Sequence, residues 1–247
     1  MRSFRLLCSI LVLTLFSAPS WADKTISYDN IALGIPECET LPGQNVTILR
    51  DQYALCYSND THIPKWVAWH LEAEDLGSTD RCNCFSADPS LPSGWYRVVT
   101  GDYTGSGYDR GHMCPSADRT DTPDDNRVTF YMTNILPQAP GNNQGPWVQL
   151  ENYERELASG GNELYVISGG SGTKGEWRSR NTQVRITIPA YTWKAILVLP
   201  EGQHDLDRVD PNTQVIAVKM PNEDIRSKDW SEYITSVDAI EGTTLDL

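Results

Sequence analysis

The sequence predicts an α+β domain built around a mainly antiparallel central sheet that is flanked by helices. Two observations favour this fold class. Short segments rich in aromatic and β-branched residues recur along most of the chain. One strongly amphipathic segment, residues 145–161, has the spacing and the end signals of a helix. We therefore expect a strand-rich domain with one prominent central helix.

The first residues of the chain have the features of an export signal. Arg2 and Arg5 precede the apolar run LLCSILVLTLF, and the following segment SAPSWA ends on a small residue. This pattern predicts a secretory signal peptide over residues 1–22, which is too short for a good membrane span. Residues 23–247 are then expected to form a single domain. No second long apolar run follows, so the sequence predicts an exported protein, periplasmic or secreted, with no membrane partner.

The segments with strand composition follow one another from residue 52 onward. The turn-forming residues 59–64 separate the first two, and Ala190 and Tyr191 separate a pair that we expect to form a hairpin. The expected strands are residues 52–58, 65–72, 127–137, 163–169, 183–189, 192–200 and 213–221.

The expected helix over residues 145–161 begins and ends at recognisable positions. Pro146 suits the first helical position, and Gly160 with Gly161 suits the stop. The helical spacing then separates a buried side from a solvent side. The predicted buried side contains Trp147, Leu150 and Leu157, with Tyr153 and Ala158 nearby. The predicted solvent side contains Glu151, Glu154 and Arg155.

The charge balance, taken alone, argues against a nucleic-acid partner. The full chain has 20 Lys plus Arg, 33 Asp plus Glu and a net charge of −13. The predicted signal contains two arginines and no acid, so its removal changes the net charge to −15. A field of this sign repels polyanions unless a local positive patch or a metal ion overrides it.

The stretch YDRGHMCPSADRT, residues 108–120, contains a histidine that allows three interpretations. Cys82, Cys84 and Cys114 could join His112 in a zinc site, although C-x-C and H-x-C are poor zinc spacings and export favours oxidised cysteines. His112 could instead be a structural residue held by a carbonyl group in a turn. It could also be a general base, which requires a neutral imidazole close to a substrate.

Residues downstream of His112 favour the third interpretation. Asn143 lies just before the predicted helix, and Glu151 and Arg155 lie one turn apart within it. Amide and carboxylate oxygens suit Mg²⁺, Mn²⁺ or Ca²⁺ better than zinc. Each residue alone also has an ordinary explanation, Asn143 as a turn residue and the other two as an exposed ion pair.

Taken together, the motifs YDRGH, PSADR, MTNILPQ and NNQGPWVQLENYEREL resemble the DNA/RNA non-specific endonucleases. These are the ββα-metal nucleases of the Serratia-nuclease type. The similarity is strongest over residues 81–156 and continues from about residue 53 to 238, in the same order. The resemblance implies a ββα-metal catalytic motif within the α+β fold.

The resemblance assigns three residues to water activation and metal binding. His112, in D-R-G-H, corresponds to the general base. Asn143, in N-Q-G-x-W, corresponds to the direct ligand of a single divalent ion. Glu151 corresponds to the acid that holds the metal through water. The implied cofactor is Mg²⁺, for which Mn²⁺ or another divalent ion can substitute.

Four further residues correspond to family positions at the phosphate or near the histidine. Arg81 matches an arginine that meets the scissile phosphate, and Arg110 is expected to contact phosphate as well. Arg155 matches an arginine that the family places at the site, and Asn134 lies at a position that orients the histidine. We also expect Arg81, Arg110, Arg155 and Arg119 to form one positive floor inside the acidic protein.

The resemblance implies an exported endonuclease that cuts DNA and RNA, single or double stranded, to products with 5′ phosphates. An exported nuclease can also have a dedicated protein inhibitor, although no residue identifies one. Two other classes of function compete with this one. The same fold could serve as a non-catalytic binding module, or the chain could be a zinc-stabilised interaction domain.

The cysteines depart from the family pattern. Cys8 lies in the predicted signal, so Cys38, Cys56, Cys82, Cys84 and Cys114 remain. We expect Cys38 to pair with Cys56, and Cys114 to pair with Cys82 or Cys84. Pairing of Cys82 with Cys84 is expected to be strained.

Overall fold

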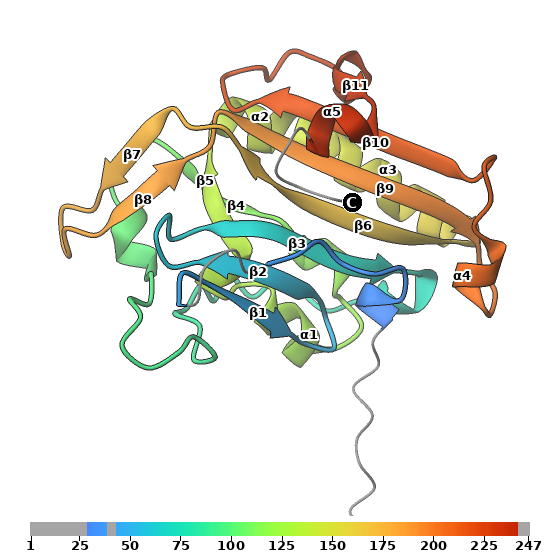
Figure 1. The fold of residues 1–247 in the computed structure, drawn as a ribbon, viewed down its shortest axis with the longest axis horizontal. Helices are drawn as coiled ribbons and strands as arrows, with labels where there is room; N and C mark the ends of the chain where they lie inside the picture. The colour runs from blue at the N-terminus through green and yellow to red at the C-terminus, as the bar shows by residue number, and fades with distance from the viewer. Residues whose placement is uncertain (1–28, 39–42, 242–247) are drawn as a thin grey trace, which may run out of the picture.

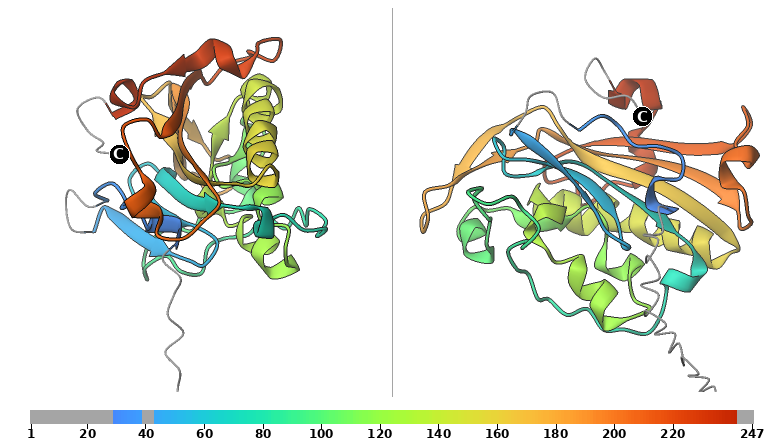
Figure 2. Two further views of the ribbon diagram at one scale, coloured as in Figure 1. Left: turned by 90° about the vertical axis from the view of Figure 1, so that its right-hand side faces the viewer. Right: turned by 60° about the horizontal axis from the view of Figure 1, so that its bottom comes forward.

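The computed structural model describes residues 29–38 and 43–241, and its fold is shown in Figures 1 and 2. The predicted signal peptide, residues 1–22, lies outside these residues. None of the described helices combines the length and the apolar character that a membrane crossing requires.

A seven-stranded sheet runs through the centre of the molecule, and all of its strand pairs are antiparallel. This sheet confirms the predicted fold class. In spatial order the strands are β1 (Asn45–Leu49), β2 (Ala54–Ser58), β3 (Pro64–Leu71), β6 (Asn162–Ser171), β9 (Tyr191–Pro200), β10 (Gln214–Pro221) and β11 (Ile234–Thr235).

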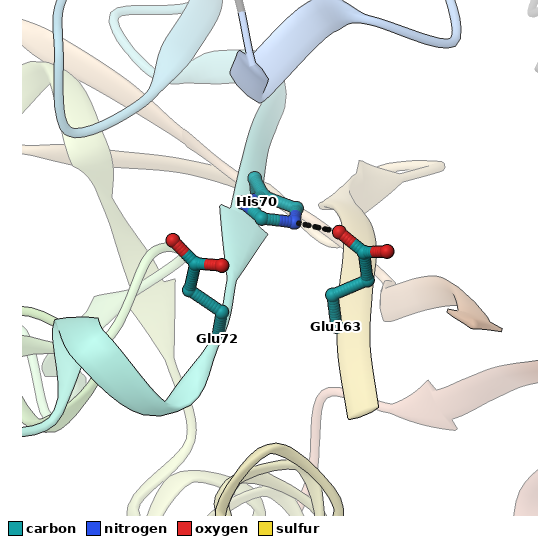
Figure 3. A group of neighbouring side chains, drawn as sticks. All are labelled: His70, Glu72 and Glu163. Carbon is teal, nitrogen blue, oxygen red and sulfur yellow. Dashed lines mark hydrogen bonds and ion pairs between the residues drawn. The ribbon is translucent and has the colours of Figure 1, made fainter. Parts of the chain in front are cut away.

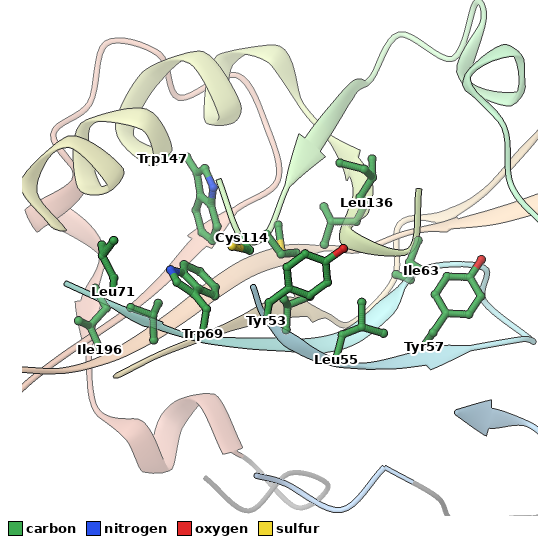
Figure 4. Close-up of a cluster of buried hydrophobic side chains, with 14 of the residues drawn as sticks. Tyr53, Leu55, Tyr57, Ile63, Trp69, Leu71, Cys114, Leu136, Trp147 and Ile196 are labelled. Atoms are coloured by element: carbon green, nitrogen blue, oxygen red, sulfur yellow. The ribbon is translucent and has the colours of Figure 1, made fainter. Parts of the chain in front are cut away.

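Both faces of the central sheet carry a cluster of buried apolar side chains. Successive side chains along a strand point to opposite faces, so one strand contributes to both clusters. In β3, for example, Trp69 joins the larger core cluster and Trp66 joins the smaller one. Figure 4 shows part of the larger cluster, with Trp69 of the sheet near Trp147 and Cys114. The smaller cluster includes Cys38 and Ile240 of α5, and Ile31 and Ile35 pack against it.

The helices and two separate hairpins complete the fold. The helices are α1 (Pro123–Val128), α2 (Pro140–Asn142), α3 (Val148–Ser159), α4 (Asp205–Arg208) and α5 (Val237–Glu241). The first pair is β4 (Asp109–His112) with β5 (Ile135–Gln138), which are joined by the long segment that contains α1 and which we call the β4–β5 hairpin. The second is β7 (Gly175–Arg178) with β8 (Arg185–Ile188), which a short loop connects. The right-hand view of Figure 2 shows α1, α2 and α3 on one side of the sheet and α5 on the other. The unit β4–β5–α3 is the expected ββα arrangement.

The strand expected over residues 127–137 is mostly wrong. Residues up to Val128 belong to α1, residues 132–134 form a 3₁₀ turn, and strand structure begins only at Ile135. The helix has strong local start signals, since the hydroxyl of Thr122 accepts from the Asp125 amide and Pro123 occupies the first helical position. These capping interactions favour a helix over the strand that the β-branched composition of the segment predicts.

The hairpin expected from residues 183–189 and 192–200 is also wrong. Strand β8 pairs with β7, whereas β9 pairs with β6 and β10. Pro189 has no amide to donate to a ladder. The next residue, Ala190, donates to Ser171 and accepts from Asn222, so this connection is bound to other strands.

The predicted central helix is confirmed as α3, but its solvent side was assigned incorrectly. A π-helical turn, Asn143–Trp147, precedes the helix, so Pro146 lies before its start. Glu154 is fully buried. The ammonium group of Lys194 on β9 compensates its charge by donating to both carboxylate oxygens, at 2.8 and 3.0 Å. Leu157 is only partly buried.

The cysteine pairing agrees with the prediction at one bridge and contradicts it at the other. Cys38 and Cys56 form a disulfide, as expected. Cys82 pairs with Cys84, and the left-handed backbone of Asn83 (φ 49°) turns the chain between them. Cys114 is a free thiol buried in the core, because both of its predicted partners, Cys82 and Cys84, are joined to each other.

Candidate active site

A polar cleft of about 400 Å³ lies at the outer end of the β4–β5 hairpin. It brings together three of the residues singled out in the sequence, Arg81, Arg110 and Asn143. Its lining consists of Arg81, Asn83, Phe85, Thr100, Tyr103, Thr104, Tyr108, Asp109, Arg110, Asn143 and Gln144.

His112 ends strand β4 and is buried beside this cleft. Its ring packs edge-on against Phe130, at 4.8 Å between centroids, and contacts Phe85 at 5.3 Å. Its Nε2 atom is buried and has no hydrogen-bond partner among the described residues. Burial, together with the nearby charges of Arg81 and Arg110, lowers the pKa of His112 to about 3. The imidazole is therefore neutral at ordinary pH, as a general base must be.

Two arginines share the aromatic contacts of the histidine. The guanidinium of Arg81 lies 4.8 Å from the ring centre of Phe130, and that of Arg110 lies 4.2 Å from the ring centre of Phe85. In the described part of the chain, no carboxylate oxygen lies within 4 Å of a guanidinium nitrogen of Arg81 or Arg110. The cleft therefore presents two arginines without an ion-pair partner next to a neutral imidazole.

Asn143 is oriented by Asp109, the first residue of β4. One carboxylate oxygen of Asp109 accepts from Nδ2 of Asn143 at 2.9 Å and from Nε2 of Gln144 at 2.8 Å. An ionised carboxylate only accepts, so the amide nitrogen of Asn143 must face Asp109 and its Oδ1 must face elsewhere. A hard amide oxygen held in this way fits a divalent ion such as Mg²⁺.

Asp109 was not predicted from the sequence, although it is the first letter of the D-R-G-H motif. The hairpin register explains how it reaches Asn143. Asp109 lies opposite Gln138, the last residue of β5, and the chain then passes through α2 to Asn143. The D-R-G-H motif was therefore the signal that could have singled out Asp109, but only the pairing of β4 with β5 shows that it contacts Asn143.

The small residue before His112 has a structural explanation. A Cβ atom on Gly111 would lie 2.1 Å from Oε1 and 2.6 Å from Cβ of Gln138. The Gln138 side chain is fully buried and donates to Oδ1 of Asn142 at 2.6 Å. Gly111 thus lets the two strands of the hairpin pack closely, and the neighbour that approaches it is Gln138.

Glu151 lies in the first turn of α3 and is partly buried. Burial raises the pKa of its carboxyl group to about 7, Lys194 opposes this rise, and Asp118 adds to it. The carboxylate is also within the electrostatic range of Arg155 and Arg81. An ionised Glu151 is therefore costly unless a cation approaches it.

The positive floor expected from four arginines consists of only two at the cleft. Arg155 donates to Asp118 at 2.8 Å and to Asn152 at 2.6 Å. Arg119 is buried, and its guanidinium donates to the carbonyl groups of Gln52 and His70. Both side chains also form ion pairs, with Asp118 and Asp75, so Arg81 and Arg110 are the two arginines of this set without a carboxylate partner in the described chain.

Asn134 supports the chain after His112 and does not face the cleft. Its side chain is fully buried, accepts from the Cys114 amide at 3.0 Å, and donates to the carbonyl groups of Cys114 and Thr129 at 2.8 and 2.9 Å. These bonds hold the turn that leaves the histidine. Asn134 does not line the cleft and lies beside the histidine only through the chain that follows it.

A different set of ligand-type side chains lies at the ends of β3 and β6. His70, Glu72 and Glu163 are the one group of its kind in the described residues, with ligand atoms within 4.8 Å of one another (Figure 3). Oε2 of Glu163 lies 3.0 Å from Nε2 of His70, and Arg208 contacts its other oxygen. Glu163 is thus neutralised by the protein, and none of these residues lines the cleft.

The zinc interpretation of the cysteines does not fit the structure. Cys82 and Cys84 are joined to each other, and Cys114 is buried in the core. Burial also raises the pKa of the Cys114 thiol, which disfavours the thiolate that zinc requires. The three sulfurs therefore do not provide a ligand set with His112.

Comparisons with known proteins identify the family of the chain. The family model described as DNA/RNA non-specific endonuclease matches residues 36–244. A nuclease of Nostoc sp. is 44% identical over 218 residues, covering 87% of this chain and 78% of the relative. A nuclease of Serratia marcescens is 33% identical over 191 residues, covering 74% and 69%.

The fold also matches a solved structure, that of EndoG in complex with EndoGI. The TM-score is 0.71, the sequence identity is 24%, and the match covers 92% of each chain. This similarity concerns the fold, whereas the family model and the two nucleases concern the sequence. The chain belongs to the DNA/RNA non-specific endonuclease family.

Proposed function

We propose that this protein is an exported, divalent-metal-dependent endonuclease that hydrolyses DNA and RNA, single or double stranded, to products with 5′ phosphates. The observation that carries the proposal is the shared cleft, in which Arg81, Arg110 and Asn143 lie beside the neutral ring of His112. Membership of a nuclease family supports the reaction class.

His112 supplies the base in this proposal. A phosphodiester is negative, so a neutral water must lose a proton as it attacks phosphorus. The neutral imidazole of His112 can accept that proton. Burial lowers the pKa of His112 most and the charges of Arg81 and Arg110 add to this, so a phosphate between the two arginines offsets their part of the effect. The ring therefore becomes a stronger base when substrate is bound.

Arg81 and Arg110 bind the phosphate and oppose the charge that develops on it. Both guanidinium groups are held against aromatic rings, so little reorganisation is needed when the anion arrives. A preorganised donor of this kind contributes about 3 kcal/mol to transition-state stabilisation in other enzymes. We assign the scissile phosphate to the space between these two side chains.

Asn143 would hold the divalent ion through Oδ1, with Glu151 supporting it through water. When bound, the ion would neutralise charge on the breaking P–O bond. Asp109 orients the amide of Asn143, and the unfavourable burial of the Glu151 carboxylate provides a reason for it to attract a cation. Mg²⁺ suits this oxygen-donor set, and Mn²⁺ can substitute.

The assigned residues act on phosphate, water and metal, and none of them requires a particular base or a 2′-hydroxyl group. This property supports activity on both DNA and RNA, as in sequence-independent phosphate binding. Export to the periplasm or the medium rests on the predicted signal peptide, residues 1–22. The EndoG/EndoGI complex supports the further proposal that a protein inhibitor can bind this fold.

The proposal is tested by digesting supercoiled plasmid and single-stranded RNA with and without EDTA. The variant His112→Asn removes the proposed base, and His204→Asn is a matched control on an exposed histidine. We expect EDTA or His112→Asn to remove cleavage of both substrates, and His204→Asn to retain it. Cleavage that survives both EDTA and His112→Asn would contradict the mechanism.

A further inference from the structure

The β7–β8 hairpin concentrates positive charge in an otherwise acidic protein. Arg178, Arg180 and Arg185 are all exposed on it, and we refer to them as the hairpin arginines. Arg178 and Arg185 lie directly opposite each other in the strand register. Like charges at directly opposed positions destabilise a strand pair unless a counter-ion is present.

The protein supplies only part of that counter-charge. Arg185 has Glu176 as a distant partner, at 3.5 Å between Nη1 and Oε2. In the described chain, no carboxylate lies within 4 Å of the guanidinium nitrogens of Arg178 or Arg180. The hairpin arginines therefore present more positive charge than the surrounding side chains neutralise, and an anion would stabilise them.

The hairpin is fixed to the wall of the catalytic cleft. Thr100, Tyr103 and Thr104 line the cleft, and Asp102 lies among them but points away into the protein. The carbonyl of Asp102 accepts from Nε1 of Trp177 at 2.8 Å, and its carboxylate accepts from Ser179 at 2.8 Å.

A second set of contacts brings one hairpin arginine to the edge of the wall. Asn181 donates to the carbonyl of Gly101 at 3.1 Å. The position that a Cβ atom would occupy on Gly105 lies 3.5 Å from Cζ of Arg180. Gly105 directly follows Thr104, a lining residue, so Arg180 lies at the edge of the wall that also lines the cleft.

We propose that the β7–β8 hairpin is a second phosphate-binding surface, which holds a nucleic-acid strand outside the catalytic cleft through Arg178 and Arg180. The ligand is the sugar–phosphate backbone of a polymer, because the donors are exposed guanidinium groups without a pocket for a base. This inference rests on the proposed nuclease function and adds a substrate property, a preference for long chains over short ones.

Each phosphate that an arginine neutralises releases counter-ions, so affinity for a polymer falls more steeply with salt when more phosphates are bound. The double variant Arg178→Gln/Arg180→Gln removes two such contacts. We expect a KM for long DNA that is at least fivefold higher at moderate salt, with kcat little changed. We also expect the slope of log KM against log salt to decrease by about 1 to 2.

The experiment compares a long duplex with a dinucleotide that fills only the cleft. The single variants Arg178→Gln and Arg180→Gln are measured as well, and Lys219→Gln is their charge-matched control. Lys219 contacts the carbonyl of Ala239 in α5, which lies on the other side of the sheet from α3 (Figure 2). We expect the arginine variants to cleave the dinucleotide as the wild type does, and Lys219→Gln to behave as the wild type on both substrates.

The outcomes separate this inference from the function on which it rests. If the wild type cleaves neither substrate in the presence of Mg²⁺, the proposed function fails. If the wild type cleaves long DNA but the double variant has the same KM and the same salt slope, the hairpin surface is overturned while the nuclease function stands. An equal loss on the dinucleotide would also overturn it, because the change would then lie in the cleft.

Discussion

Replacing Glu151 with glutamine is expected to stabilise the metal-free protein at alkaline pH while removing activity. Burial raises the pKa of this carboxyl group from its ordinary value of 4.5 to about 7. Folding therefore favours the protonated form. The favourable contribution is complete below pH 4.5, and it is lost as the pH rises through 7. Glutamine stays neutral throughout and avoids that loss.

The magnitude follows from the pKa difference. Since a tenfold change in proton affinity corresponds to about 1.4 kcal/mol, ionisation of Glu151 costs at most about 3 kcal/mol. The side chain is partly exposed, and water screens part of this cost, so we expect about 1–2 kcal/mol. For a domain of this size the gain corresponds to an increase in Tm of about 3–6 °C.

The assay is thermal unfolding in EDTA from pH 5 to pH 8. The Tm difference between Glu151→Gln and the wild type should grow between pH 5 and pH 8, and Mg²⁺ at pH 8 should raise the Tm of the wild type more than that of the variant. Glu156→Gln, an exposed position on the same helix, is the control. A Tm difference for Glu151→Gln that does not change with pH would refute the reasoning.

Three further predictions concern other parts of the structure. Asp109→Ala frees the amide of Asn143, so the Mg²⁺ concentration for half-maximal activity should rise about 10-fold or more; an unchanged Mg²⁺ titration would remove Asp109 from this role. Lys194→Met leaves Glu154 buried without a partner and should cost about 3–5 kcal/mol in denaturant unfolding, whereas Lys194→Met/Glu154→Gln should recover part of that loss; equal destabilisation of the single and double variants would contradict the pairing. Cys56→Ser opens the bridge to Cys38 and should cost about 2–4 kcal/mol; the same loss in wild type under reducing conditions would support the assignment, and no loss in either case would oppose it.

Much of the sheet could be predicted from local patterns. The segments at 52–58, 65–72, 192–200 and 213–221 coincide closely with β2, β3, β9 and β10. Each of these strands buries side chains on both faces of the sheet, which gives a nearly continuous apolar run in the sequence. The segment at 127–137 failed because a short capped helix and a 3₁₀ turn compete with strand formation there.

The candidate site could also be predicted only in part. The motifs singled out Arg81, Arg110 and Asn143, and the structure brings these three into one cleft beside His112. The sequence did not distinguish free arginines from bound ones. Arg119 and its partners Gln52 and His70 are 67 and 49 residues apart, and no local pattern encodes such contacts.

The fold class, the family and a set of candidate site residues could all be inferred from the chain alone, because periodicity, caps and motifs are local properties. Which charged side chains remain without a partner depends on the folded arrangement. The helical spacing places Glu154 on the solvent side, but in the structure it is buried against Lys194, which lies 40 positions away in the sequence. A charge is neutralised by whatever lies next to it in space, and that neighbour is set by packing between distant segments.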